Sequence, residues 1–373
     1  RPSRRASFRF SLQLRDNCKC GSCLHPETRQ KLLDTGSLDV NIRPSAMQVN
    51  EEGRLEVLWP DGHRSVFDAS WLYRYGQSFM HDTFEGQLDV ETGGLRPPVE
   101  TWDRTRIWKH FPEIAYEEFQ SSEEGLKRWL ELVYKYGFAV IRGVPTEKEK
   151  VVEVVHRFAY VKETSYGVTF DVVSEPEPDH LAFTGRYLEH HTDMNYREKS
   201  PGLQLLHCIQ AKSSGADESM GKSFFVDGFY VAQWLEEHEP TAFHILSSTP
   251  IRFQIKSGGK RYSNLWPVIL LDNQGNVSEI HYNNRTMGPL QAPGHIIIPF
   301  YHALKLFVSK LRDQQTELVF QMLPGDLVAF NNRRVLHGRT SFDPTKVTRH
   351  LVGCYVDIDE AFSVYDSLLA KGV

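Results

Sequence analysis

A histidine and an aspartate two residues apart, His191 and Asp193, place the strongest constraint on the fold of this chain. In an extended segment, residues i and i+2 point to the same face, so both side chains can converge on one ion. A third ligand must then come from a distant part of the sequence. His337 is the best candidate, because a hydrophobic segment of strand character, 328–330, runs into a polar turn just before it.

Two histidines and one carboxylate on one side of a metal leave its other side open, as in non-haem Fe(II) oxygenases. Arg349 follows His337 by twelve residues, in a largely apolar segment. Its guanidinium fork suits the distal carboxylate of a 2-oxo acid that chelates the metal. A His-x-Asp pair alone is weak evidence, since a surface strand end also explains it. The pair, the distant histidine before Gly338 and the arginine together favour the metal site.

Three of the five cysteines lie within six residues, and the odd total is a poor framework for disulfides. With a histidine from a predicted hairpin they form a Cys3His set, which is typical of closed, tetrahedral structural zinc sites. We favour His63 over His25 because His63 follows the turn at 60–62, and free thiols in a loop are the alternative. The predicted zinc ligands are Cys18, Cys20, Cys23 and His63.

Composition excludes several classes of protein. The chain has 373 residues, 40% hydrophobic and 24% charged, as in ordinary globular proteins. Its formal charge of −5 leaves no basic excess to neutralise phosphates, so we expect no nucleic-acid partner. No apolar run approaches the roughly 20 residues of a membrane helix, so we expect no membrane partner.

The cysteine content also bears on the compartment, because unpaired thiols favour a reducing one. We therefore expect a cytoplasmic protein. The mitochondrion is the alternative, because the basic, acid-free segment 1–7 resembles the remnant of a transit peptide.

Turn and periodicity signals predict two domains, a small zinc-binding β domain at 1–95 and a catalytic domain at 100–373, separated by a Gly- and Pro-rich linker. A capping box at 121–124 predicts the start of a helix. Many strands separated by turns, with a few flanking helices, predict a mainly β jelly roll, the double-stranded β-helix. The segments of strand character include 8–12, 55–59, 64–67 and 138–141, and a hairpin of 318–320 with 327–330 that leads to His337.

Over nearly its whole length the chain resembles the 2-oxoglutarate dioxygenases of carnitine biosynthesis, the family of gamma-butyrobetaine dioxygenase and trimethyllysine dioxygenase. The motifs that carry the resemblance are LRDNC at 14–18, WPDGH at 59–63, HTD at 191–193, QLLHC at 204–208, VDGF at 226–229, LHGR at 336–339 and RHL at 349–351. By this resemblance, Fe(II) would be held by His191, Asp193 and His337. Arg349, with Leu206 lining the pocket, would bind 2-oxoglutarate, and ascorbate would support activity.

The resemblance also implies the partners. The cysteine cluster with His63 would hold zinc in a domain that forms a homodimer in relatives. The substrates would be O2 and a small quaternary amine, whose trimethylammonium group cannot donate hydrogen bonds and is recognised by aromatic faces. The positions that match the family's substrate contacts are Tyr166, Phe170, Phe183, Met194, Asn283 and Tyr355.

Several of these positions depart from the family. Phe170 stands where Trp is usual, Phe183 and Met194 where Tyr is usual, and His180 where Asn is usual. Phe is a poorer cation partner than Trp, and Met has no ring, so the aromatic cage is weakened. Ordinary core packing is the alternative role for each aromatic residue.

We therefore expect a hydroxylase that converts gamma-butyrobetaine to L-carnitine. The weakened cage leaves two enzymatic alternatives, a trimethyllysine hydroxylase and a dioxygenase that acts on another small amine or amino acid. An inactive metal-binding scaffold is the alternative from a different class. The complete ligand set with Arg349 argues against it, because no structural role requires that combination.

Overall fold

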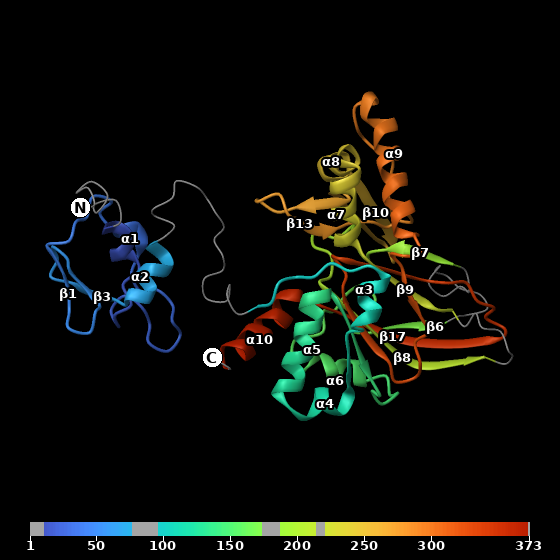
Figure 1. Ribbon diagram of the computed structural model, residues 1–373, viewed down its shortest axis with the longest axis horizontal. Coiled ribbons are helices and arrows are strands. Elements are labelled where there is room, and N and C mark those ends of the chain that lie inside the picture. The colour runs from blue at the N-terminus through green and yellow to red at the C-terminus, as the bar shows by residue number, and fades with distance from the viewer. Residues whose placement is uncertain (1–10, 77–95, 174–186, 214–220, 372–373) are drawn as a thin grey trace. The chain divides into compact units, whose positions relative to one another are not determined.

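The computed structural model describes residues 11–76, 96–173, 187–213 and 221–371 (Figure 1). The chain divides into two compact units, Arg1–Gly93 and Gly94–Val373. Within the described ranges, none of the helices is both long and apolar enough to cross a bilayer.

The small unit is built on a three-stranded antiparallel sheet in the order β1-β2-β3. Strands β2 and β3 form the expected hairpin, and Val57, Trp59 and Phe67 make a small core. A core of this size stabilises a domain only weakly, so a metal cluster would add needed stability. The elements are α1 (Ser11–Asp16), η2 (Thr35–Ser37), β1 (Ala46–Val49), β2 (Leu55–Leu58), β3 (Arg64–Phe67) and α2 (Ala69–Gly76).

The strand expected at 8–12 is wrong where the structure describes it. Ser11 and Leu12 begin helix α1, and residues 8–10 lie outside the described part of the chain. The helix buries Ser11 and Arg15, which are four residues apart and therefore share one helical face. Arg15 is buried beside the cysteines and donates to Cys23 Sγ, a contact that the helical conformation makes possible. The apolar alternation at 8–12 carries no sign of this contact.

The large unit contains two facing β-sheets, and the expected jelly-roll class is confirmed. The six-stranded sheet has the order β4-β5-β15-β8-β17-β6, and the four-stranded sheet has the order β14-β9-β16-β7. All neighbours are antiparallel except β4 and β5. The strands are β4 (Glu113–Ala115), β5 (Phe138–Arg142), β6 (Phe170–Val173), β7 (Leu188–His191), β8 (Leu203–Ser213), β9 (Ser223–Asp227), β14 (Leu318–Phe320), β15 (Leu327–Asn331), β16 (Val335–Arg339) and β17 (Val347–Val356).

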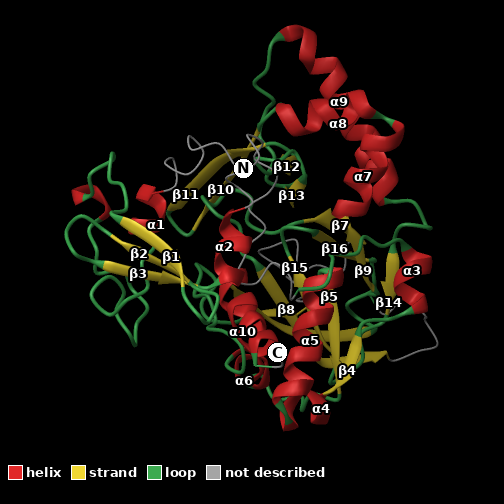
Figure 2. Ribbon diagram, turned by 60° about the vertical axis from the view of Figure 1, so that its left-hand side comes forward, coloured by secondary structure: helices red, strands yellow, loops and turns green. Residues whose placement is uncertain are grey.

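The central strands of the six-stranded sheet are buried on both faces, because their apolar residues alternate between two cores. On β5, Phe138 and Val140 point into the core between the sheets, whereas Ala139 and Ile141 point toward a helical layer. Helices α4, α5, α6 and α10 form that layer (Figure 2). The helices around the sheets are α3 (Arg104–Lys109), α4 (Tyr116–Ser121), α5 (Glu123–Tyr136), α6 (Lys150–Val155) and α10 (Ile358–Ala370).

Helix α5 begins where the capping signal predicts. The hydroxyl of its N-cap, Ser122, accepts a hydrogen bond from the Gly125 amide at 3.0 Å. The helix ends at Tyr136, and Gly137 after it has a φ of 66°, the left-handed conformation that glycine tolerates. The chain then enters β5 without a longer connection.

The segment between β9 and β14 forms a lobe with its own core. Its helices α7, α8 and α9 lie together beside the lobe's hairpins in Figure 1. The same core includes Met194 and Tyr355, so the lobe reaches the candidate site. Its elements are α7 (Gly228–His238), α8 (Pro240–Ser248), β10 (Ile251–Ser257), β11 (Lys260–Trp266), β12 (Ile269–Leu271), β13 (Val277–Ile280) and α9 (Gly294–Leu311).

The hairpin expected from 318–320 with 327–330 is also wrong. Both segments are strands, but β14 pairs with β9 in one sheet and β15 pairs with β5 and β8 in the other. The intervening turn therefore carries the chain across from one sheet to the other. The turn residues between the two segments predicted that the strands pair with each other. Strands distant in sequence, β9 for β14 and β5 and β8 for β15, are the actual partners. From β15 the chain returns to the four-stranded sheet as β16.

Candidate active site

Strands β7 and β16 bring the two histidines of the predicted metal set together. They are antiparallel neighbours, and His191 and His337 are directly paired across them, with ring centroids 4.2 Å apart. Asp193 follows β7 and completes the group. Its Oδ1 lies 3.4 Å from His191 Nε2, and its Oδ2 lies 3.8 Å from His337 Nε2. The ligand atoms of all three side chains lie within 4.8 Å of one another, close enough to bind one ion.

Asn332 fixes the backbone of Asp193 from the turn between β15 and β16. Its Oδ1 accepts a hydrogen bond from the Asp193 amide at 2.7 Å, and its Nδ2 donates to the Asp193 carbonyl at 3.1 Å. The next residue, Met194, has a φ of 59°, which is unusual for a residue other than glycine. The backbone bends away sharply there and leaves the Asp193 carboxylate beside the histidines.

The protonation states suit a divalent cation. His191 Nδ1 lies 2.7 Å from the Glu189 carbonyl oxygen, which assigns its proton to Nδ1 and leaves Nε2 free to bind a metal. Burial, reinforced by repulsion from His191, lowers the pKa of His337 to about 3, so its imidazole is neutral at neutral pH. Burial alone would raise the pKa of Asp193, but the two histidines and the Tyr355 hydroxyl lower it, so the carboxylate is ionised.

Arg349 lies between the two sheets. It belongs to β17, and its Nη2 donates to the Ser223 hydroxyl on β9 at 3.0 Å. Burial lowers the pKa of Arg349 to about 10, so the guanidinium stays charged at neutral pH. Within the described ranges it forms no ion pair with a carboxylate. Because a buried charge without a counter-ion is costly, this arrangement indicates that an anionic ligand binds there.

Leu206 lies on β8, in the same sheet as Arg349. It is buried and pairs with Gly353 of β17. A side chain at Gly353 would clash with Phe170 and crowd Leu206, so glycine provides space for both apolar groups.

The structure also places most of the predicted substrate contacts. Phe170 stacks on Tyr355 with ring centroids 5.1 Å apart, and Tyr166 adjoins Phe170 at 6.4 Å. Asn283 donates from Nδ2 to the Thr192 carbonyl at 3.4 Å, next to Asp193. Phe183, together with the departing position His180, lies outside the described residues. Four aromatic or polar side chains thus gather near Asp193, and Met194 follows it in the chain.

Sequence reasoning missed two further residues of the site, Asn332 and Arg285, and one contact of the predicted residue Tyr355. Asn332 clamps Asp193, but an Asn in a turn carries no special signal. The hydroxyl of Tyr355 donates to Asp193 Oδ2 at 2.9 Å, a contact that the expected cage role did not include. Arg285 lies in the turn that Asn283 stabilises, through a hydrogen bond from the Arg285 amide to Asn283 Oδ1 at 3.2 Å. Although the side chain of Arg285 is exposed, desolvation by its surroundings lowers its pKa, and the charge of Asp193 opposes that shift.

The small unit brings together the second predicted ligand set. His63 Nε2 lies 3.3, 3.6 and 3.5 Å from the sulfurs of Cys18, Cys20 and Cys23. Zinc bonds of about 2.3 Å to sulfur and about 2.0 Å to nitrogen, at tetrahedral angles, place the two atoms about 3.5 Å apart. The cluster therefore has the dimensions of a zinc site. His25 is engaged elsewhere, since its Nδ1 accepts a hydrogen bond from the Thr28 amide.

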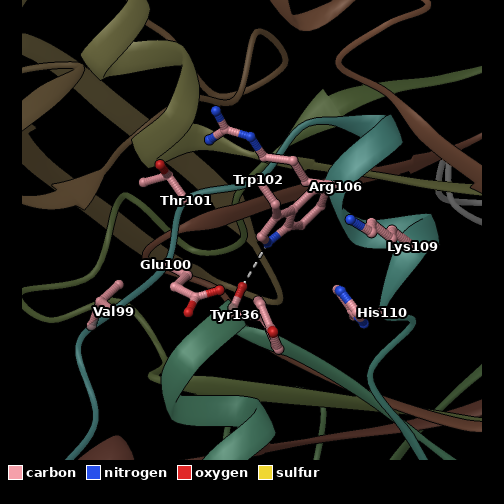
Figure 3. Close-up of a pocket in the computed structure, with 8 residues that line it drawn as sticks. All are labelled: Val99, Glu100, Thr101, Trp102, Arg106, Lys109, His110 and Tyr136. Carbon is pink, nitrogen blue, oxygen red and sulfur yellow. Dashed lines mark hydrogen bonds between the residues drawn. The ribbon is translucent and has the colours of Figure 1, made fainter.

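A separate cavity of about 500 Å³ in the large unit contains none of these residues (Figure 3). The Trp102 indole on its wall donates to the Tyr136 carbonyl at 2.7 Å, as the dashed line shows. Its lining includes the exposed side chains of Arg106, Lys109 and His110. The predicted metal ligands and Arg349 are not among the residues that line this cavity.

Comparison with known protein families identifies both parts of the chain. Residues 97–355 match the taurine catabolism dioxygenase TauD, TfdA family, and residues 3–73 match the gamma-butyrobetaine hydroxylase-like N-terminal family. The chain belongs to the TauD/TfdA dioxygenase family. It is therefore a dioxygenase, and the resemblance to the carnitine-biosynthesis enzymes is confirmed.

Relatives of this TauD/TfdA dioxygenase include gamma-butyrobetaine dioxygenases and trimethyllysine dioxygenases. Gamma-butyrobetaine dioxygenase of Pseudomonas sp. (strain AK-1) is 34% identical, over 96% of this chain and 90% of the relative. The human gamma-butyrobetaine dioxygenase is 32% identical, over 94% and 88%. The mitochondrial trimethyllysine dioxygenase of Rattus norvegicus is 30% identical, over 94% and 80%.

A solved structure supports the fold of the dioxygenase unit. The taurine dioxygenase from Burkholderia xenovorans superposes with a TM-score of 0.50, over 70% of this chain and 90% of that chain, at 9% identity. At so low an identity the likeness concerns the fold alone.

Proposed function

We propose that this protein is an Fe(II)- and 2-oxoglutarate-dependent hydroxylase of a small quaternary-ammonium substrate, and that it converts gamma-butyrobetaine to L-carnitine. One observation carries the proposal. His191, Asp193 and His337 converge at one point, and the buried Arg349 of the same unit lacks an anionic partner among the described residues. The first relatives named above are gamma-butyrobetaine dioxygenases, which supports this choice of substrate.

His191, Asp193 and His337 would hold Fe(II) on one side and leave positions for the co-substrate and O2. Bound iron, with 2-oxoglutarate and O2, supplies the oxidation that inserts one oxygen atom into an unactivated C–H bond and releases succinate and CO2. The protein's part is to place the reactants. Glu189 and Asn332 orient the ligands through hydrogen bonds, and such partners commonly support metal affinity.

Arg349 would bind the distal carboxylate of 2-oxoglutarate, with the Ser223 hydroxyl as a second donor. Because both groups lie between the sheets, the carboxylate would be held away from water, where a charged hydrogen bond is strong. Leu206 would exclude water from the same space.

The aromatic group formed by Tyr166, Phe170 and Tyr355 would accommodate the trimethylammonium end of the substrate. Asn283 would contact the substrate carboxylate at the other end. Arg285 belongs to the same turn, so its cation would be a second group for that carboxylate. A substrate with a cation at one end and a carboxylate at the other fits this distribution of groups.

In the small unit, Cys18, Cys20, Cys23 and His63 would bind structural zinc, as the tetrahedral spacing supports. The homodimer remains a prediction. Exposed Met47 and Val49 on the edge strand β1 support it, because an apolar edge strand readily pairs with a second copy. The cytoplasmic location also remains a prediction.

Two measurements test the function. Anaerobic addition of Fe(II) and then 2-oxoglutarate should produce the weak visible charge-transfer band of the chelate, and His191→Ala should abolish it. Succinate formation, with ascorbate present, should then be stimulated more by gamma-butyrobetaine than by trimethyllysine or other amines. Greater stimulation by trimethyllysine would instead identify the alternative function that the rat relative suggests. Retention of the band in His191→Ala would remove the proposed iron site.

A further inference from the structure

Tyr355 belongs to two parts of the candidate site at once. Its ring forms part of the aromatic group, stacked on Phe170 at 5.1 Å with an interplanar angle of 28°. Its hydroxyl donates a hydrogen bond to Asp193 Oδ2 at 2.9 Å. The side chain is 4% exposed, so water does not compete freely for that bond. A residue that lines the substrate site thus also contacts one of the three predicted metal ligands.

The surrounding sheet holds the Tyr355 ring in place. Tyr355 lies on β17 and pairs with Gln204 of β8, while Phe170 lies on the neighbouring strand β6. Phe170 pairs with Gly353, and a Cβ atom at Gly353 would come within 2.4 Å of the Phe170 ring. The absence of a side chain at Gly353 therefore lets Phe170 pack flat against Tyr355. The hydroxyl is aimed by a packed aromatic pair on a regular sheet.

The hydrogen bond from Tyr355 restricts the rotation of the Asp193 carboxylate. Asn332 fixes the backbone of Asp193 at both its amide and its carbonyl, but it does not determine the rotation of the carboxylate. Oδ1 lies 3.4 Å from His191 Nε2, and Oδ2 accepts the Tyr355 hydroxyl. The hydroxyl therefore supplies the contact that selects one orientation of the carboxylate plane.

We propose that Tyr355 is a positioning residue for the metal site, and that its hydroxyl holds Asp193 in the orientation that binds the metal. This inference rests on the proposed function, since it takes His191, Asp193 and His337 as the ligands. It goes beyond the cage role that the family resemblance implies for Tyr355. One consequence is that a substrate cation packed on the Tyr355 ring would contact the residue that orients a metal ligand.

Tyr355→Phe separates the two roles, because phenylalanine keeps the ring and its stacking on Phe170 but removes the hydroxyl. If the hydroxyl positions Asp193, metal affinity falls in the absence of any substrate. The loss expected for a residue that orients a metal ligand is about 10- to 100-fold. If Tyr355 contributes only its ring to the cage, metal affinity stays unchanged.

Mn(II) is a suitable probe because it does not react with O2 and prefers oxygen-rich over thiolate ligands, so it avoids the cysteine cluster. The full-length, zinc-loaded protein is titrated with Mn(II) without 2-oxoglutarate, and free Mn(II) is followed by electron paramagnetic resonance. Tyr365→Phe is the matched control. It removes a buried tyrosine hydroxyl from the same unit, but Tyr365 lies on α10, outside the metal cluster and the aromatic group.

We expect wild type and Tyr365→Phe to bind Mn(II) equally, and Tyr355→Phe to bind it at least about 10-fold more weakly. An unchanged thermal midpoint in Tyr355→Phe ensures that the loss is local. Equal affinity of Tyr355→Phe and wild type would overturn the inference. His191→Ala separates failure of this inference from failure of the proposed function. If His191→Ala binds Mn(II) like wild type, the metal site itself is wrong. If His191→Ala loses Mn(II) binding while Tyr355→Phe keeps wild-type affinity, only the role of Tyr355 is disproved.

Discussion

The two ligand clusters of this protein are assembled in opposite ways. The cysteine cluster has four ligands, and three of them come from six consecutive residues of the small unit. The histidine and aspartate cluster has three ligands, from β7 with the residues that follow it and from the distant β16. A four-ligand set satisfies a tetrahedral metal completely and stabilises the fold. A three-ligand set leaves room for reactants, and its geometry depends on the sheet.

The side chains that support the two clusters also differ, in charge and in the contacts that they make. In the small unit, Arg15 donates to Cys23 Sγ at 3.4 Å, so a cation stabilises a set of soft, anionic ligands. In the large unit, Asn332 and Tyr355 donate hydrogen bonds to Asp193 and fix its direction. Charge compensation suits a closed structural site, whereas control of direction suits a site that must present open positions.

The largest expected effect is the loss of zinc from the small unit. Cys23→Ser removes a thiolate from the cluster, so bound zinc should be lost and the small unit should unfold at ordinary temperature. Metal analysis and calorimetry measure both changes. His25→Ala is the matched control, because His25 lies outside the cluster and zinc should remain. The two clusters would not be independent if Cys23→Ser also abolished Mn(II) binding in the large unit.

The next effect concerns the co-substrate. Arg349→Met should raise the KM for 2-oxoglutarate by about 100-fold or more, because it leaves a buried carboxylate without its cation. The KM for 2-oxoglutarate of Arg349→Lys should lie between those of wild type and Arg349→Met, since lysine keeps the charge but not the fork of the guanidinium. Succinate formation at varied 2-oxoglutarate measures the change, and zinc content should be unaltered in both variants. A KM for 2-oxoglutarate that stays at the wild-type value would contradict the role of Arg349.

Acid should weaken the large unit through a residue that binds neither metal. Burial lowers the pKa of His207 to about 4. Its ordinary value is about 6.5, so protonation favours the unfolded chain, and stability is complete above about pH 6.5 and falls toward about pH 4. The full loss is about 3 kcal/mol. Denaturant unfolding at several pH values measures the free energy of unfolding of the large unit. Between about pH 6.5 and pH 4 it should fall less steeply for His207→Gln than for wild type. Equal pH dependence of the two proteins would disprove this prediction.

The smallest effect concerns the substrate cation. Phe170→Leu removes one aromatic face, so the KM for the trimethylammonium substrate should rise by a factor of about 3 to 5, the equivalent of a weak cation–π contact. The matching analogue with a neutral tert-butyl group should bind equally well to both proteins, because it gains nothing from the ring's charge distribution. An equal loss for both compounds would assign Phe170 a packing role only.

Sequence reasoning performed best where the signal was local. The cap at Ser122 marks the start of α5, and the turn at 60–62 marks the hairpin of β2 and β3. It failed where strands chose partners far along the chain, as with β14 and β15. It also missed the contact between the Tyr355 hydroxyl and Asp193, because no spacing relates a strand of one sheet to the segment that follows a strand of the other.

The sequence by itself determined the ligand types and their order: two histidines, an aspartate and an arginine in one unit, and three cysteines with a histidine in the other. Those choices follow from coordination chemistry, which side-chain identity largely decides. Only the tertiary structure decided that His337 pairs directly with His191, that Arg349 is buried without a carboxylate partner in the described ranges, and that Tyr355 contacts Asp193. The register between strands sets these contacts, and register depends on the packing of both sheets together.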